Sequence, residues 1–214
     1  LEVPVHGITS IDQVHKSKIN VLNIWKEEVK IELGKSTQIA GEYAAKSLES
    51  ATEHLNNKKI DVLLTAPFNK ENIQSENFNF AGHTEFLESK LEGKSLMILL
   101  TEKLRIGLLT GHIPISKVPE TITQELIERK VEIMCHSLKQ DFKISKPKIA
   151  VLGLNPHCGD KGVIGNEDDE IIAPTIKKIN ESGKLVFGPY AADGFFGSET
   201  YNQFDGVLAT YHDQ

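Results

Sequence analysis

Apolar residues recur every three to four positions between residues 37 and 56, and this spacing predicts an amphipathic helix. The apolar stripe consists of Ala40, Ala44, Ala45, Leu48, Ala51 and Leu55. A second helix is expected to begin near Pro119, because proline suits the first helical turn. Its inward positions are Ile122, Leu126, Ile133 and Leu138. A third helix is predicted over residues 167–179, where Pro174 must either kink it or mark its true start.

Short, uniformly apolar runs separate these helices, as is typical of strands buried on both faces. The runs are residues 60–66, 95–101, 104–110, 148–154, 184–187 and 205–210. Glu102 and Lys103 lie between two of the runs and predict a tight turn. Because helices alternate with such strands, the pattern predicts an α/β chain with a three-layer α/β/α arrangement around a mostly parallel sheet.

A polar, Asn-rich stretch at residues 74–80 lies between periodic segments. We therefore expect a first lobe over residues 1–80 and a second lobe over residues 81–214. The chain opens at Leu1 without a methionine and stops at Gln214 directly after a predicted strand. From this we expect both lobes to be incomplete, with the fold truncated at both ends.

The composition narrows the class of protein. Apolar residues make up 39% and charged residues 25% of 214 residues, which is typical of a globular chain. The net charge of −6 gives no electrostatic preference for nucleic acid or an anionic membrane. We therefore expect no nucleic-acid partner and, since no apolar run could cross a bilayer, no membrane partner. Two cysteines and no signal-peptide pattern favour a cytoplasmic location.

Histidines follow three of the predicted strands. His112, His157 and His212 come directly after residues 104–110, 148–154 and 205–210. The carboxyl ends of parallel strands lie at one edge of a sheet, so these side chains can converge on a divalent metal ion with an open position. The alternative is that each is a hydrogen-bonding loop residue, and spacing alone favours that alternative.

The segment GHTEFL at residues 82–87 is a second candidate. Thr84 is expected to cap a helix through its hydroxyl, with Glu85 in the first turn. Free N–H groups at a helix start suit a phosphate or carboxylate, to which His83 can add a hydrogen bond. The alternative is an ordinary helix cap beside an exposed histidine.

A glycine-rich loop at residues 159–165 follows His157 but fits neither nucleotide-binding glycine pattern. Its glycines can serve simply to turn the backbone. Cys158 has no second cysteine nearby, so we expect a free thiol. Asp193 follows a predicted strand and could join the histidines or cap a helix.

Six segments occur in one order: TAPFNK at 65–70, GHTEFL at 82–87, TGHIPISKVPETIT at 110–123, GLNPHCGDKGVIGNED at 153–168, GPYAAD at 188–193 and YHDQ at 211–214. This series closely resembles the 4-hydroxythreonine-4-phosphate dehydrogenase family of pyridoxal phosphate biosynthesis. The resemblance runs from about residue 34 to residue 214.

The resemblance implies an isocitrate/isopropylmalate dehydrogenase-like fold and an NAD-dependent oxidation of 4-phosphohydroxy-L-threonine. Loss of carbon dioxide from the product then gives 3-amino-2-oxopropyl phosphate. The family is a homodimer whose active site lies across the subunit interface. The implied partners are thus this small phosphorylated hydroxy amino acid and a second copy of the chain.

The resemblance also implies roles for individual residues. His112, His157 and His212 match the ligands of a divalent ion (zinc, cobalt or magnesium) that the family shares between subunits. His83 and Thr84 match the pair that holds the substrate phosphate, and Asp193 matches an acidic position to which we assign proton transfer. NAD contacts are not assigned to any residue.

The chain departs from the family pattern at several places. It lacks the usual opening Gly-Asp-Pro segment and the region after Tyr-His-Asp-Gln, and Cys158 and Asp160 stand where Ala and Glu are usual. Three alternatives therefore stay open: a dehydrogenase for phosphorylated threonate or erythronate, a phosphate acyltransferase, and a non-catalytic fragment. The histidines argue against the acyltransferase, which needs no metal.

Overall fold

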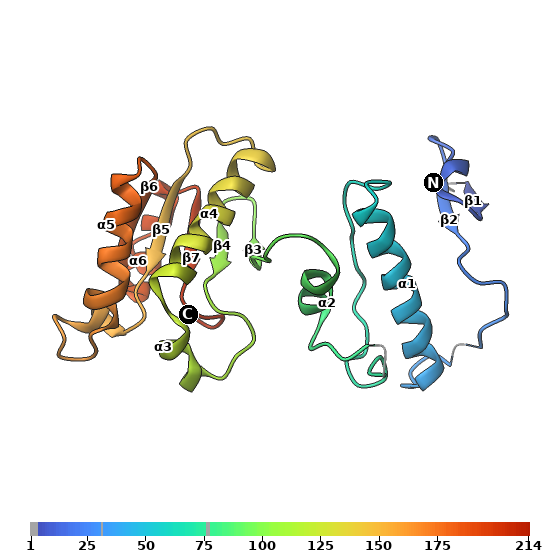
Figure 1. The fold of residues 1–214 in the computed structure, drawn as a ribbon, viewed down its shortest axis with the longest axis horizontal. Coiled ribbons are helices and arrows are strands. Elements are labelled where there is room, and N and C mark those ends of the chain that lie inside the picture. The colour runs from blue at the N-terminus through green and yellow to red at the C-terminus, as the bar shows by residue number, and fades with distance from the viewer. Residues whose placement is uncertain (1–3, 31, 76–77) are drawn as a thin grey trace. The chain divides into compact units, whose positions relative to one another are not determined.

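The computed structural model describes residues 4–30, 32–75 and 78–214, which form two compact units (Figure 1). The first unit is Leu1–Gly93 and the second is Lys94–Gln214. None of the helices in the described ranges combines the length and the apolar composition that a membrane-spanning helix needs.

The second unit is built on a five-stranded sheet. In spatial order its strands are β3 (Ile98–Leu100), β4 (Arg105–Leu108), β7 (Gly206–Ala209), β5 (Lys148–Leu152) and β6 (Leu185–Tyr190). Four strands run parallel, and β3 alone pairs antiparallel, through a hairpin with β4. The predicted mostly parallel sheet is therefore confirmed, as is the turn at Glu102–Lys103.

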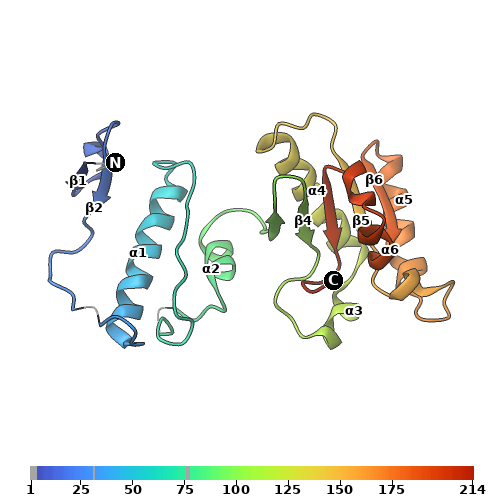
Figure 2. The ribbon, with the colours of Figure 1, turned by 180° about the vertical axis from the view of Figure 1, so that it is seen from behind.

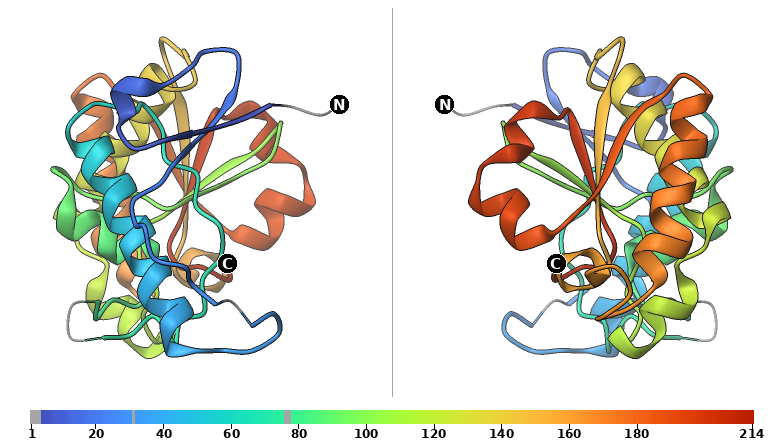
Figure 3. Two further views of the ribbon diagram at one scale, coloured as in Figure 1. Left: turned by 90° about the vertical axis from the view of Figure 1, so that its right-hand side faces the viewer. Right: turned by 90° about the vertical axis from the view of Figure 1, so that its left-hand side faces the viewer.

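Helices cover both faces of this sheet. Alternate residues of one strand show the division: Ile149 and Val151 pack with one core, and Ala150 and Leu152 pack with the other. The first core lies under α4 (Gln124–Gln140) and α5 (Ala173–Glu181), and the second lies under α6 (Ala192–Gly197). Figures 2 and 3 show α6 on the face opposite α4 and α5. The predicted three-layer α/β/α fold is confirmed.

Two helix predictions are refined by proline and by a backbone break. The helix expected near Pro119 is divided into α3 (Val118–Thr121) and α4, because Ile122 is extended and Thr123 caps α4 through its hydroxyl. Helical backbone already begins at residue 167, as predicted: a single π-helical turn, Asp168–Ile172, leads directly into α5. Pro174 lies in the first turn of α5, so it marks the change from the π-helical turn to regular α-helix.

The strand predicted at residues 95–101 exists as β3, but its predicted burial is wrong. The run at residues 95–101 was expected to be buried, but β3 is an edge strand in which Leu99 and Leu100 are exposed. An edge strand has a neighbour on one side only, so apolar side chains alone do not specify burial there.

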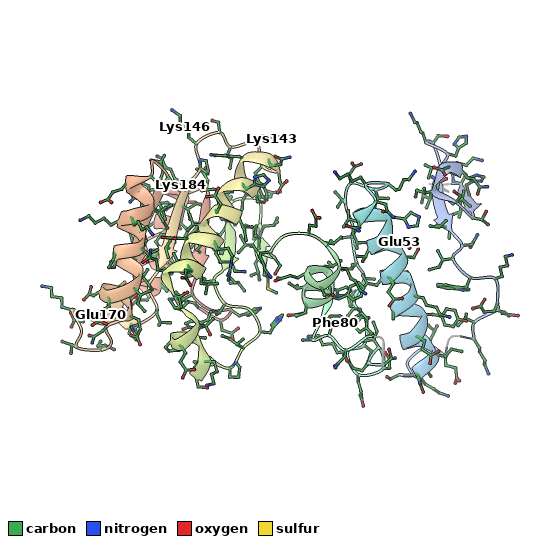
Figure 4. All side chains as sticks on the ribbon, in the orientation of Figure 1. Glu53, Phe80, Lys143, Lys146, Glu170 and Lys184 are labelled. Carbon is green, nitrogen blue, oxygen red and sulfur yellow. The ribbon has the colours of Figure 1, made fainter. Side chains whose placement is uncertain are left out.

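The first unit is centred on α1 (Gln38–Asn56), which begins after Thr37 as predicted. The Thr37 hydroxyl accepts a hydrogen bond from the Ala40 N–H and so caps the helix. A small aromatic core joins α1 to α2 (His83–Lys90). Its central residues are Phe78 and Phe86, stacked with ring centroids 5.1 Å apart, and Phe80 packs edge-on against both. Figure 4 labels Phe80 in the first unit.

The remaining strands of the first unit are β1 (Val5–Ile8) and β2 (Ile19–Leu22), which form a parallel pair. The run at residues 60–66 was predicted to be a buried strand, and that prediction is wrong. It pairs with neither β1 nor β2, and Val62 and Leu64 are 78% and 94% exposed. An apolar run becomes a strand only where a neighbouring strand pairs its N–H and C=O groups.

Along the chain, the boundary between the two compact units falls after Gly93, whereas the sequence predicted a lobe boundary at residue 80. The difference is α2, which the aromatic contacts of Phe86 attach to the first unit. The polar stretch at residues 74–80 is thus a loop inside that unit, and Phe78 within it is fully buried.

Candidate metal and substrate site

Three histidines follow adjacent parallel strands of the second unit, as the sequence predicted. His112 follows β4, His212 follows β7 and His157 follows β5, and these strands are neighbours in the order β4, β7, β5. All three side chains are exposed. They therefore lie in turns at the carboxyl edge of the sheet, where ligands of open α/β sheets bind.

Two of these histidines come together. The ring centroids of His112 and His212 lie 5.9 Å apart, with the rings tilted by 34°. Two imidazoles that bind one ion at about 2 Å have their ring centroids roughly 5–6 Å apart, depending on the angle at the ion. The pair is therefore close enough to share one divalent cation.

A cavity of about 380 Å³ lies beside this pair. Its lining comes from the turns after β4 and β7 and from the start of α3: Gly111, His112, Ile113, Ile115, Val118, Tyr211, His212 and Asp213. The lining combines apolar side chains with a few polar ones, as in sites that orient a small ligand.

Buried and partly buried hydrogen bonds hold the turn that carries His212. The Thr110 hydroxyl donates to the Thr210 carbonyl oxygen at 2.7 Å, which joins the ends of β4 and β7. The Gln214 side-chain oxygen accepts from the Thr210 N–H and hydroxyl, both at 2.8 Å, while its amide donates to the Gly153 carbonyl oxygen. Gln214 thereby links the ends of β7 and β5.

The side chain of Asp213 orients the ring of His212. Nδ1 of His212 lies 2.9 Å from Oδ1 of Asp213. A carboxylate that binds one ring nitrogen fixes the ring and leaves the other nitrogen available to a metal. This arrangement was not anticipated from the sequence, although the adjacent Asp in YHDQ carried the signal.

His157 lies in an unusual turn and adds no third ligand to the pair within this chain. Six consecutive residues, from His157 to Gly162, have positive φ angles between 44° and 87°. Among residues 4–30, 32–75 and 78–214, no group of three His, Cys, Asp or Glu side chains could hold a metal ion. The structure therefore joins His112 and His212 and leaves the predicted triad incomplete in one chain.

Asp193 lies at the carboxyl end of β6, in the first turn of α6. Ala191 is the residue before that helix, and Asp193 accepts a hydrogen bond from the adjacent Gly194 N–H at 2.7 Å.

The thiol of Cys158 has a raised pKa of about 11. Burial is the largest cause, and the negative charges of Asp168, Asp169 and Asp193 add to it. Cys158 is free, as expected, and its high pKa makes it a poor nucleophile at neutral pH.

The substrate residues predicted from GHTEFL belong to the first unit. Helix α2 begins at His83 after Gly82, and no side chain caps it. The prediction that Thr84 caps the helix is wrong: Thr84 is the second helical residue, because the flexible Gly82 takes the capping position. Glu85 lies in the first turn as expected. The His83 ring lies 4.1 Å from the Phe68 ring, and burial lowers the pKa of His83.

A three-layer α/β/α unit with histidine-bearing turns at the carboxyl edge of its parallel strands defines an α/β protein with a ligand site at that edge. The sequence matches the family "Pyridoxal phosphate biosynthetic protein PdxA" over residues 1–214, and the chain belongs to this family. The resemblance stated from its motifs is confirmed.

Relatives with curated names agree with the family. A 4-hydroxythreonine-4-phosphate dehydrogenase of Bacteroides thetaiotaomicron is 48% identical over 209 residues, which cover 97% of this chain and 57% of that protein. One from a Sulfurihydrogenibium species is 40% identical and is matched over 100% of this chain and 66% of its own length. The chain therefore spans about three fifths of the length of these relatives.

Solved structures support the fold. A crystal structure of a 4-hydroxythreonine-4-phosphate dehydrogenase from Klebsiella pneumoniae superposes with a TM-score of 0.83 at 28% identity, covering 99% of this chain and 65% of that one. One from Burkholderia phymatum gives a TM-score of 0.81 at 30% identity, covering 99% and 65%.

Proposed function

We propose that this chain carries part of the active site of an NAD-dependent 4-hydroxythreonine-4-phosphate dehydrogenase of pyridoxal phosphate biosynthesis. The observation that carries the proposal is the pairing of His112 and His212 beside a cavity at the ends of β4 and β7. The family membership and the printed names of the relatives support the same activity.

The reaction is the oxidation of the secondary alcohol of 4-phosphohydroxy-L-threonine. The hydroxyl loses its proton, the carbon loses a hydride to NAD, and the resulting β-keto acid loses carbon dioxide to give 3-amino-2-oxopropyl phosphate. A bound divalent ion supplies polarisation of the alcohol oxygen, and NAD supplies the hydride acceptor that no side chain can replace.

The metal ligands of this proposal are His112, His212 and His157, and the ion is zinc, cobalt or magnesium. His112 and His212 fit the ion as a pair, and Asp213 fixes the ring of His212. Because no group of three ligands forms among the described residues, we propose that His157 completes the site from a second copy of the chain, in a homodimer.

The chain's own residues bind and orient the substrate in this proposal. The first N–H groups of a helix have no intrahelical partner, and in this proposal those of α2 bind the substrate phosphate together with the side chains of His83 and Thr84. Anchoring the phosphate fixes the reacting carbon and lowers the entropic cost of the reaction. Asp193 is exposed at the start of α6 and is our candidate for receiving the hydroxyl proton.

Metal binding and NADH formation test the proposal together. Wild-type chain, His212→Ala and His136→Ala are titrated with cobalt(II), and NADH absorbance is followed with 4-phosphohydroxy-threonine, zinc and NAD. His136 is an exposed histidine on α4, away from the strand ends, and provides the matched control. We expect His212→Ala to weaken cobalt binding at least tenfold and His136→Ala to leave it unchanged.

The other outcomes separate the alternatives. If NADH forms with phosphorylated erythronate or threonate but not with 4-phosphohydroxy-threonine, the chain belongs to a dehydrogenase for one of those other substrates. Tight cobalt binding without any turnover identifies a non-catalytic fragment of the fold. Equal cobalt affinity in wild type and His212→Ala removes the metal site itself.

A further inference from the structure

The carboxylate of Asp168 is fully buried beside the end of β5, at 0% exposure. Its Oδ1 accepts a hydrogen bond from the Leu154 N–H at 2.8 Å, and its Oδ2 accepts one from the Asn155 N–H at 2.9 Å. The Asn155 side-chain amide donates a further bond to Oδ2 at 3.0 Å. A buried carboxylate costs free energy unless donors stabilise it, so these three N–H groups account for its presence in the core.

Where β5 ends, these bonds take the place of hydrogen bonds to a neighbouring strand. Gly153 still donates to the Tyr190 carbonyl oxygen of the neighbouring strand, whereas Leu154 and Asn155 bind Asp168 instead. Asn155 also donates to Glu167 at 2.8 Å, and this bond is the main reason why the pKa of Glu167 is lowered. Asp168 and Glu167 thus fix Leu154 and Asn155, the two residues that come directly before Pro156.

The turn at residues 157–162, which follows Asn155 and Pro156, needs support from neighbouring side chains because its backbone conformation is unfavourable. Left-handed backbone costs about 1–2 kcal/mol for each residue other than glycine, and four such residues lie between His157 and Gly162. Glycines make the packing tight: a Cβ on Gly153 would meet Cys158 Sγ at 2.7 Å and Asp168 Oδ1 at 2.8 Å. The turn therefore depends on its surroundings rather than on its own backbone preference.

We propose that Asp168 is a positioning residue that holds the turn carrying His157 in its left-handed conformation at the carboxyl edge of the sheet. The inference rests on the proposed function, in which His157 is a metal ligand. It parallels the way that Thr110 and Gln214 fix the turn carrying His212. In each case a polar side chain outside the ligand set holds the turn that carries the ligand.

The test compares Asp168→Asn with Asp169→Asn, which removes the same charge from the adjacent, exposed residue. Cobalt(II) is titrated into each variant, and amide hydrogen exchange is measured in the turns at residues 157–162 and 211–213. We expect Asp168→Asn to weaken cobalt binding about 10–100-fold and to raise exchange selectively at residues 157–162. Asp169→Asn is expected to match wild type in both measurements.

Two results overturn the inference. One is wild-type cobalt affinity in a folded Asp168→Asn chain, and the other is an equal rise in exchange in both turns, which indicates a merely structural role. If Asp168→Asn does not fold, Asn155→Ala removes one donor and keeps both backbone N–H bonds, and we expect a smaller change of the same kind.

The outcomes also separate this inference from the proposed function. If wild type and His212→Ala bind cobalt alike, the metal site fails, while the exchange pattern still decides whether Asp168 holds the turn. If His212→Ala weakens binding and Asp168→Asn does not, only the positioning role fails.

Discussion

The two units of the chain differ in how completely they bury their apolar residues. In the second unit, β4, β7, β5 and β6 lie in one sheet between α4 and α5 on one face and α6 on the other. In the first unit, β1 and β2 form a sheet by themselves, and Leu64 remains 94% exposed.

The difference shows where stability and chemistry reside. Burial on both faces of a parallel sheet contributes roughly 25 cal/mol for each Å² of apolar surface removed from water. The turns with His112, His157 and His212 project from that well-packed sheet, whereas His83 and Thr84 lie on a short helix held by a small aromatic core. The proposed metal site therefore has the more rigid support.

The largest expected effect comes from separating the units. A chain of residues 94–214 alone should unfold cooperatively, because both of its cores lie within that range. Residues 1–93 alone should show no cooperative transition, because their core is small. Urea unfolding followed by circular dichroism measures both, and a cooperative transition in the 1–93 fragment alone would reverse the comparison.

A pair of truncations sharpens the contrast at single residues. Ile149→Ala should lower the free energy of unfolding by about 2–5 kcal/mol, because Ile149 is fully buried in the second unit. Leu64→Ala should change it by less than about 0.5 kcal/mol, because Leu64 is exposed. Urea titration measures both values; similar losses would mean that residues 60–66 are covered in solution.

The sequence predicted the elements that periodicity and local capping determine. Helix α1 begins after Thr37 as expected, and helical backbone begins at residue 167 as expected. The parallel strands were found because residues buried on both faces leave continuous apolar runs. Placement of a histidine after each of three strands was likewise visible in the sequence.

What the sequence could not predict depends on partners distant along the chain. Residues 60–66 look like a strand but have no pairing neighbour in the structure. Asp168 binds backbone N–H groups 14 and 13 residues earlier, so no local pattern reveals its role. Gly82, not Thr84, occupies the N-cap position of α2. Both residue types are common at helix starts, so the sequence alone does not distinguish them.

Replacing glycine by alanine should change the free energy of unfolding in opposite directions at one position in each unit. A Cβ on Gly41 of α1 would clash with the Asn72 carbonyl oxygen, so Gly41→Ala should cost about 1–3 kcal/mol despite alanine's higher helix propensity. Gly194 of α6 has open space, so Gly194→Ala should stabilise by about 0.5–1 kcal/mol. Thermal unfolding measures both; stabilisation by Gly41→Ala would mean that α1 does not pack on that loop.

The smallest expected effect is a pH dependence confined to the first unit. Burial lowers the pKa of His83 in the folded chain, so the unfolded chain binds a proton more readily. The stability that this histidine contributes is therefore complete above its unfolded pKa of about 6.5 and is lost as the pH falls from that value through the lower folded pKa. His83→Phe keeps a ring against Phe68 and cannot titrate, so its free energy of unfolding should fall less between about pH 7 and pH 5. Phe68→Ala, which exposes His83 to water, should flatten the slope in the same way. Urea unfolding across this range measures all three chains, and an identical slope in wild type and His83→Phe would show that His83 is solvated in the folded chain.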